Sequence, residues 1–212
     1  MDITSNINHY FIRFGEYESF NKLPDGYNEI LKLNLQNDKK PALLINLLAL
    51  LIMAAMAVIG HMIVPITVLF DFADGISVYF LRLIALVPGT FVYIILHELV
   101  HGVCMKCFGA QKINYGLTGL YAYAGSMCYF TKKAYVVIAL SPIIVWGIVL
   151  LTLNFFVNEQ WFWVIYFIQI MNISGAAGDL YVTFKFSKMP KDILVQDTSI
   201  EMTAFSANSF MK

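Results

Sequence analysis

The chain has 212 residues, of which 59% are hydrophobic and 13% are charged. Soluble globular domains average about 45–50% apolar and about 25% charged residues, so this composition excludes an ordinary water-soluble domain and indicates a membrane protein. Lys and Arg together number 14, as do Asp and Glu. This balance gives no reason to expect a nucleic-acid partner or a strongly acidic one.

Residues 1–40 are mixed and polar, so we predict a cytoplasmic N-terminal segment without a cleaved secretory signal. Within this segment, Leu23-Pro24-Asp25-Gly26 predicts a turn. Apolar residues then alternate over 30–35, which is typical of a short strand or an amphipathic helix.

Four apolar stretches are long enough to cross a bilayer, which takes about 20 residues. They cover residues 42–70, 78–105, 134–157 and 161–177. We therefore predict an all-α membrane protein, a four-transmembrane-helix bundle with short cytoplasmic extensions. Its transmembrane domain covers residues 41–188, and a cytoplasmic tail follows over 189–212.

Lysines gather at one end of the predicted spans. They are Lys39, Lys40, Lys106, Lys112, Lys132, Lys133, Lys185, Lys188 and Lys191. The connections at the other end carry Asp71, Asp74 and Glu159, with Arg82 as their cation. By the positive-inside rule, the protein lies in the cell membrane with both termini in the cytoplasm. Thiols at the cytoplasmic end stay reduced, so no disulfide framework is expected.

The segment between the second and third spans is rich in glycine and tyrosine, which predicts a small β-hairpin. Open sheet cannot lie in lipid, so the hairpin belongs at the interface or inside the bundle near a site. Its tyrosines could present an edge to an extended substrate or form an interfacial aromatic belt. Residues 193–202, with Ile200 among them, suggest another short strand or a ragged extension.

The sequence HELVH at residues 97–101 lies inside the second span. On a helix, residues four apart share a face, so His97 and His101 can bind one Zn²⁺ ion. Glu98 is one residue round from that face, where it can act as general base on a zinc-activated water. Ionisable groups inside a membrane usually mark a functional path.

A catalytic zinc needs a third protein ligand and an open position. Asp179 lies at the end of the fourth span. The second and fourth spans cross the membrane in the same direction, so Asp179 should lie at the same depth as His97 and His101, and we predict it as the third ligand. The alternatives are that Asp179 is an interfacial carboxylate and that Cys104, three residues past His101, is a ligand instead. Asn172 lies about two turns before Asp179 and is a candidate for substrate binding, or else simply joins helices by hydrogen bonding.

Several motifs occur in a fixed order along the chain: HELVHG at 97–102, the glycine- and tyrosine-containing segment, Ala-Leu-Ser-Pro at 139–142, and Gly178-Asp179-Leu180. From Pro24 to Asp197 the chain resembles the bacterial membrane proteins described as putative zincin peptidases. The resemblance implies a zinc-dependent membrane peptidase with His97 and His101 as ligands and Glu98 as catalytic residue. The layout is also similar to the site-2 proteases, in which a later helix supplies an aspartate ligand. Asp179 matches that position, but the longer Asn-Pro-Asp-Gly type of motif is missing.

The prediction for function is a zinc metalloprotease embedded in the lipid bilayer. It would hydrolyse a peptide or membrane-protein substrate as an endopeptidase, through a metal-activated water. Two alternatives stay open at this point: a membrane protein that binds or transports metal, and a catalytically silent zincin-like scaffold. The sequence leaves the oligomeric state open.

Overall fold

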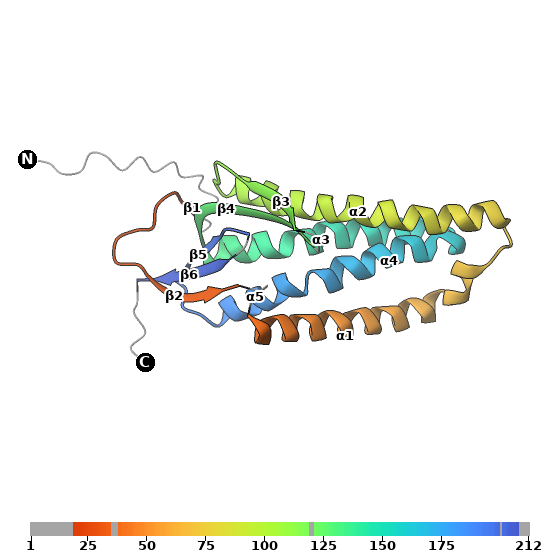
Figure 1. The fold of residues 1–212 in the computed structure, drawn as a ribbon, viewed down its shortest axis with the longest axis horizontal. Helices are drawn as coiled ribbons and strands as arrows, with labels where there is room; N and C mark the ends of the chain where they lie inside the picture. The colour runs from red at the N-terminus through yellow and green to blue at the C-terminus, as the bar shows by residue number, and fades with distance from the viewer. Residues whose placement is uncertain (1–18, 35–37, 119–120, 200, 208–212) are drawn as a thin grey trace, which may run out of the picture.

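The computed structural model of the protein describes residues 19–34, 38–118, 121–199 and 201–207. It shows an elongated helix bundle with a small antiparallel sheet at one end (Figure 1). The elements follow in the order β1 (Ser19–Phe20), β2 (Asn28–Leu33), α1 (Lys39–Ile63), the 3-10 helix η1 (Ile66–Phe70), α2 (Ile76–Cys107), β3 (Asn114–Thr118), β4 (Tyr121–Thr131), α3 (Lys132–Phe156), α4 (Glu159–Gly175), α5 (Ala177–Ser187), β5 (Leu194–Asp197) and β6 (Met202–Ser206).

Four helical segments are long and apolar enough to cross a membrane: α1, α2, α3, and α4 together with α5. Their outward-facing side chains are strongly exposed, with Leu43 at 72%, Met62 at 80% and Phe155 at 84%. Soluble proteins rarely expose contiguous apolar patches of this kind, because contact with water is unfavourable. The four helices therefore indicate a membrane protein.

The first apolar stretch is shorter as a helix than the predicted span, because α1 ends at Ile63. Pro65 disfavours helical backbone in the residue before it, and Val64 is accordingly extended with φ −132° and ψ 118°. The chain then forms η1 before α2 begins. The fourth stretch is interrupted as well, since α4 ends at Gly175 and α5 starts after the turn residue Ala176.

Side-chain caps set the starts of two helices. Thr131 accepts a hydrogen bond from the backbone N–H of Ala134 at the start of α3, and Asn158 accepts one from Trp161 at the start of α4. Such caps satisfy backbone N–H groups that have no partner within the helix. They separate α3 from β4 on one side and from α4 on the other.

The fold is mostly helical, as predicted, but the sheet is larger than the predicted hairpin and is not confined to the segment between the second and third helices. The strand order is β1-β4-β5-β6-β2, and β3 pairs with the first half of β4. The described strands thus come from before, between and after the helices. Local sequence patterns can indicate a strand, but they carry no information on these distant pairings.

The segment that was left open as strand or amphipathic helix is the strand β2, although Leu35 of that segment lies outside the described residues. The C-terminal stretch forms two strands, β5 and β6, and Ile200 between them also lies outside the described residues. Residues 1–18 and 208–212, which hold both termini, are likewise outside them. The three-part division at residues 40 and 188 stays a prediction.

A buried apolar cluster joins the sheet to the ends of the helices. It includes Leu33, Met105, Phe130, Tyr135, Ile138, Val182, Phe186, Ile193, Val195 and Ala204. A second cluster lies where α1 and η1 meet α4, with Trp163 and Tyr166 at its centre. The first cluster supports the ends of α2, α3 and α5 that carry the candidate site.

Candidate metal centre

His97 and His101 face one another on consecutive turns of α2. Their ring centroids lie 5.0 Å apart, and the two side chains are 12% and 10% exposed. Glu98 joins them in a group whose ligand atoms all lie within 4.8 Å of one another. The helical period of the HELVH segment therefore brings two imidazoles and a carboxylate together in a nearly buried position.

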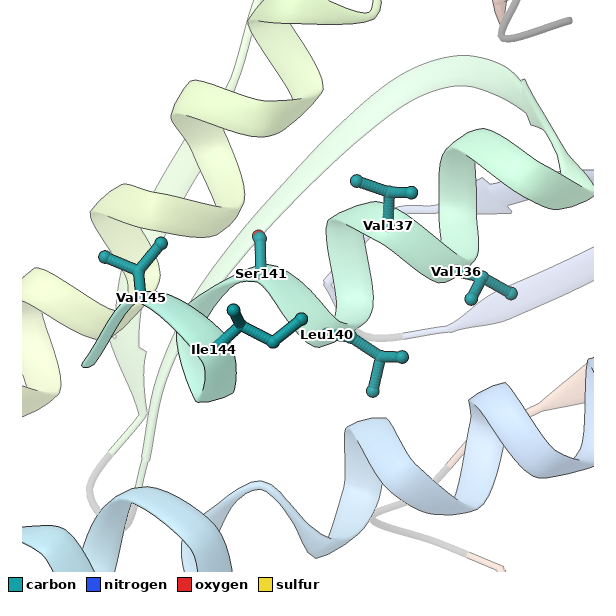
Figure 2. A pocket seen from close by; sticks show the side chains of 6 residues that line it. All are labelled: Val136, Val137, Leu140, Ser141, Ile144 and Val145. Carbon is teal, nitrogen blue, oxygen red and sulfur yellow. The ribbon is translucent and has the colours of Figure 1, made fainter. Parts of the chain in front are cut away.

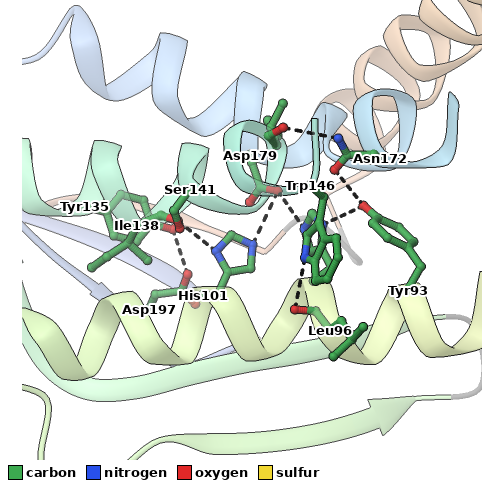
Figure 3. A network of polar contacts seen from close by, with 12 residues as sticks. Tyr93, Leu96, His101, Tyr135, Ile138, Ser141, Trp146, Asn172, Asp179 and Asp197 are labelled. Carbon is green, nitrogen blue, oxygen red and sulfur yellow. Dashed lines mark hydrogen bonds and ion pairs between the residues drawn. The ribbon is translucent and has the colours of Figure 1, made fainter. Parts of the chain in front are cut away.

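Asp179 approaches this group from a different helix. Its Oδ2 atom lies 3.7 Å from Nε2 of His97 and 3.7 Å from Nε2 of His101. The carboxylate reaches this position because α5 begins at Ala177, so Asp179 stands in its first turn, directed toward α2 (Figure 3). The structure thus brings together the three residues that the sequence predicts as metal ligands.

The donor set and its spacing fit Zn²⁺. Zinc binds imidazole nitrogen and carboxylate oxygen at about 2.0–2.2 Å in a tetrahedron, so neighbouring ligand atoms are separated by about 3.4 Å. The two distances of 3.7 Å from Asp179 are close to that separation. Two histidines and one aspartate would leave a fourth position for water or substrate.

Each imidazole makes a second contact through its other ring nitrogen, His101 with the neighbouring helix α3 and His97 within α2. Nδ1 of His101 lies 2.9 Å from the backbone oxygen of Ile138 on α3. Nδ1 of His97 lies 2.8 Å from the hydroxyl of Tyr93, one turn earlier on α2. In both residues Nε2 is therefore the nitrogen that faces Asp179.

Asn172 is fully buried on α4, beside Tyr93. Its amide oxygen accepts a 3.0 Å hydrogen bond from Tyr93, and its amide nitrogen donates a 3.2 Å hydrogen bond to the backbone oxygen of Ile143. Both ends of the amide are thus engaged within the bundle. The predicted contact of Asn172 with substrate stays a prediction.

Glu98 lies on the side of α2 that faces the sheet. Its carboxylate interacts with the backbone of Ala124 on β4. The first half of β4 therefore runs alongside the residue predicted as general base.

Three polar residues near the centre were not predicted from the sequence: Tyr93, Tyr135 and Asp197. The hydroxyl of Tyr135 on α3 donates a 2.7 Å hydrogen bond to the carboxylate of Asp197 on β5, which also accepts a hydrogen bond from the backbone N–H of Ser199. Burial raises the pKa of the Asp197 carboxyl above its ordinary value. Tyr93 could have been found from its spacing of four residues before His97, whereas nothing local in the sequence points to Asp197.

Cys104 was an alternative ligand. It packs against the buried cluster below the site, and it is a free cysteine. Among the residues that the structure describes, Cys104 does not join His97, Glu98 and His101 in the group whose ligand atoms are close enough to share one ion.

A shallow apolar depression runs along α3 (Figure 2). Its lining residues are Val136, Val137, Leu140, Ser141, Ile144 and Val145. None of these six side chains is ionisable, and the Ser141 hydroxyl donates to the backbone oxygen of Ile138 within the helix. The depression offers no acid, base or metal ligand, so the candidate site is the cluster on α2 and α5.

The fold and the site define a helix bundle of the membrane type that encloses a His-Glu-His group. Residues 90–194, just under half of the chain, match the family model described as "Putative zincin peptidase", the family that the sequence motifs resemble. The description indicates a metalloprotease and implies zinc as the metal. Neither the search of curated proteins nor that of solved structures found a match.

Proposed function

We propose that the protein is a zinc-dependent endopeptidase embedded in the membrane. The observation that carries the proposal is the position of Asp179, whose carboxylate comes from a separate helix to within 3.7 Å of both imidazole nitrogens. A pair of helical histidines can arise for packing reasons alone. A half-buried carboxylate equally distant from both is what a metal site of two nitrogens and one oxygen requires.

His97, His101 and Asp179 would hold the metal. A bound Zn²⁺ supplies Lewis acidity, which polarises a peptide carbonyl and makes a coordinated water more acidic. The family description supports zinc as the ion.

Glu98 is the residue we assign to proton transfer. It is next to His97 in sequence and belongs to the same compact group, so its carboxylate can take a proton from the attacking water and pass it to the leaving amine. The half-buried setting keeps bulk water from competing for that proton.

The substrate in this proposal is a peptide or a segment of a membrane protein that reaches the site from the lipid bilayer. Strand β4 supports this, because Ala124 of β4 contacts Glu98 and an extended segment beside β4 would pass the reacting group. The lysines support a cytoplasmic location of the sheet, because Lys39, Lys106, Lys132 and Lys185 all lie near the helix ends that carry it (Figure 1).

The test compares wild type with Glu98→Gln, each purified in detergent. We expect both to bind one zinc, and we expect the variant to lose cleavage of membrane-derived peptides by about 100-fold or more, since general acid–base catalysis contributes about 10²–10⁴-fold. Glu159→Gln is the matched control, because Glu159 is exposed at the far end of the bundle. It should cleave like wild type.

Cleavage that survives Glu98→Gln would contradict the proposal. Zinc uptake by liposomes that survives the same substitution would favour the transport alternative instead. Zinc binding without cleavage in wild type, over a broad set of membrane peptides, would favour the silent scaffold.

A further inference from the structure

The carbonyl groups of α3 contact both histidines of the candidate metal centre, one directly and one through two side chains (Figure 3). The direct contact joins Ile138 to His101, and the indirect contact runs from Ile143 through Asn172 and Tyr93 to His97. Neither contact belongs to the HELVH motif itself. Together they determine which nitrogen of each ring carries the proton.

The direct contact exists because of Pro142. A proline has no backbone N–H, so the carbonyl four residues earlier in a helix has no helical donor. In α3 that carbonyl belongs to Ile138, which instead accepts from His101 Nδ1 at 2.9 Å and from the Ser141 hydroxyl at 2.9 Å. A carbonyl only accepts, so Nδ1 of His101 carries the proton and Nε2 keeps a free lone pair.

The indirect contact has a fixed direction as well. The carbonyl of Ile143 only accepts, so the atom of Asn172 that faces it at 3.2 Å must be the amide nitrogen. The amide oxygen of Asn172 then faces Tyr93 at 3.0 Å and must receive the single hydroxyl proton of that residue. The Tyr93 oxygen can therefore only accept from His97.

His97 Nδ1, at 2.8 Å from the Tyr93 oxygen, consequently carries a proton, and Nε2 of His97 is left as the lone-pair nitrogen. This is the nitrogen that lies 3.7 Å from Asp179. The two sets of contacts thus prepare the same nitrogen in both rings. Tyr93 and Asn172 are buried at 7% and 0% exposure, so water does not offer an alternative partner.

We propose that α3 sets the metal-binding tautomer of both histidines, through the carbonyl that Pro142 leaves free and through the Asn172–Tyr93 relay. This inference rests on the proposed metal centre and deepens it. Tyr93, Asn172 and Pro142 are positioning residues in it, since none of them contacts the metal or the substrate. In this inference Asn172 positions His97 through Tyr93 and does not contact the substrate.

Zinc affinity, measured by competition with a chelator on the full chain in detergent, is the first test. Loss of a partner that orients a metal ligand typically costs about 10–100-fold in metal affinity. We expect Tyr93→Phe to show a loss in this range, and Asn172→Ala to show a loss although it does not touch His97. Pro142→Ala, which adds an N–H that competes for the Ile138 carbonyl, should cost about tenfold.

Two matched controls separate this effect from general loss of stability. Tyr166→Phe also removes a buried hydroxyl with a helix-carbonyl partner, Met56, but lies away from the site. Pro88→Ala also removes a proline from the interior of a membrane helix, α2. Both variants should bind zinc as wild type does.

A spectroscopic readout shows the tautomer directly. In the zinc-loaded protein, NMR of ¹⁵N-labelled histidine should show two Nδ1–H protons protected from exchange. Tyr93→Phe should remove the protection of one of them, and Pro142→Ala should weaken the other. A variant that only loosens the fold would affect both together.

The inference is overturned if Tyr93→Phe and Asn172→Ala keep wild-type zinc affinity while His97→Ala and His101→Ala lose it. In that case the proposed metal centre is supported, and the proposed role of α3 in setting the tautomers is wrong. If His97→Ala and His101→Ala also keep wild-type affinity, the proposed metal centre itself is wrong. If one of the Tyr93 and Asn172 variants does not fold, the other and Pro142→Ala carry the same test.

Discussion

Tyr135 and Asp197 form a 2.7 Å hydrogen bond that joins the helix bundle to the sheet, from the first turn of α3 to the end of β5. Both residues are buried, with Tyr135 at 2% and Asp197 at 7% exposure. Because Ile138, the partner of His101, lies one turn beyond Tyr135, this contact also anchors the part of α3 that touches the site. The sheet is thus part of the support of the candidate metal centre.

The stability of the protein should depend on pH through Asp197. Burial raises the pKa of this carboxyl above 3.8, so the folded protein binds its proton more tightly than the unfolded chain. The contribution of Asp197 to stability is complete below about pH 4 and is lost as pH rises through the folded pKa. Asp197→Asn removes this loss, so thermal unfolding with a chelator present should show the variant gaining on wild type as pH rises from about 4 to 8.

The exposed Asp25 offers the control for that measurement, and Asp25→Asn should run parallel to wild type. Only the change with pH is informative, because an asparagine can satisfy just one of the two donors, Tyr135 and Ser199, that Asp197 accepts from. A stability difference that is constant with pH, or that grows toward acid, would contradict the expectation.

Removal of Asp179 should weaken metal binding more than removal of any orienting residue. Loss of a residue that orients a ligand costs about 10–100-fold in affinity, so loss of a ligand itself should exceed 100-fold. We expect Asp179→Ala to show this loss in chelator competition, and Asp179→Asn to remain strongly impaired because the amide lacks the negative charge. Asp74→Asn, at an exposed position at the far end, should have no effect. Equal zinc affinity in Asp179→Ala and wild type would remove Asp179 from the ligand set.

Arg82 should be a strong determinant of stability at the end of the bundle remote from the sheet. It is fully buried and donates hydrogen bonds to the backbone oxygens of Val68, Asp71 and Gln160, which connects the loop after η1 to the start of α4. Hydrogen bonds from a charged group are worth about 1.5–3 kcal/mol each, so Arg82→Met should lose roughly 2–5 kcal/mol of unfolding free energy.

The unfolding free energy of Arg82→Lys should lie between those of Arg82→Met and wild type. An ammonium group cannot reach three separate carbonyls as a guanidinium does. The exposed Lys191 provides the control substitution Lys191→Met, which should leave thermal stability in detergent unchanged. If Arg82→Met unfolds at the same temperature as wild type, the expectation is contradicted, and the three carbonyls have other donors.

Gly60 should tolerate no side chain. It is the buried glycine of α1, and a Cβ atom there would overlap the ring of Tyr166 and come within 3.0 Å of Trp163. Tyr166 is held by its hydrogen bond to Met56, so α1 would have to move away from α4. Overpacking of this kind costs about 1–3 kcal/mol, and Gly60→Ala should lower the unfolding temperature accordingly. Gly175→Ala is the control, because a Cβ there meets open space; a similar loss in both variants would point to helix flexibility instead of overpacking.

Much of the site could be predicted because its geometry is local. The spacing of His97, Glu98 and His101 follows from the period of one helix, and the apolar length of the chain around them indicates the membrane. Asp179 could be placed by depth, since the second and fourth apolar stretches run in the same direction. The interruption at Ala176 brings the carboxylate of Asp179 to the histidines, and it lies between Gly175 and Gly178.

The sheet and the second layer of contacts could not be predicted in the same way. β5 pairs with β4 across more than one helix of intervening chain, and no periodicity in Leu194–Asp197 specifies that partner. Asn172 was a candidate for substrate binding because it lies about two turns before Asp179 in the sequence. Its partners, a tyrosine on α2 and a carbonyl on α3, depend on how three helices pack, which a single sequence does not reveal.

The strands β5 and β6 also impose an order of events during synthesis. Asp197 and the strand β5, which pairs with β4, leave the ribosome after the helices that carry His97 and Asp179. Until then Tyr135 has no carboxylate partner, and the second half of β4 pairs with β1 but lacks β5 on its other edge. A chain that has not yet reached β5 therefore lacks this support for the helices of the candidate site, so the hydrolytic activity we propose would arise only once β5 has joined the sheet.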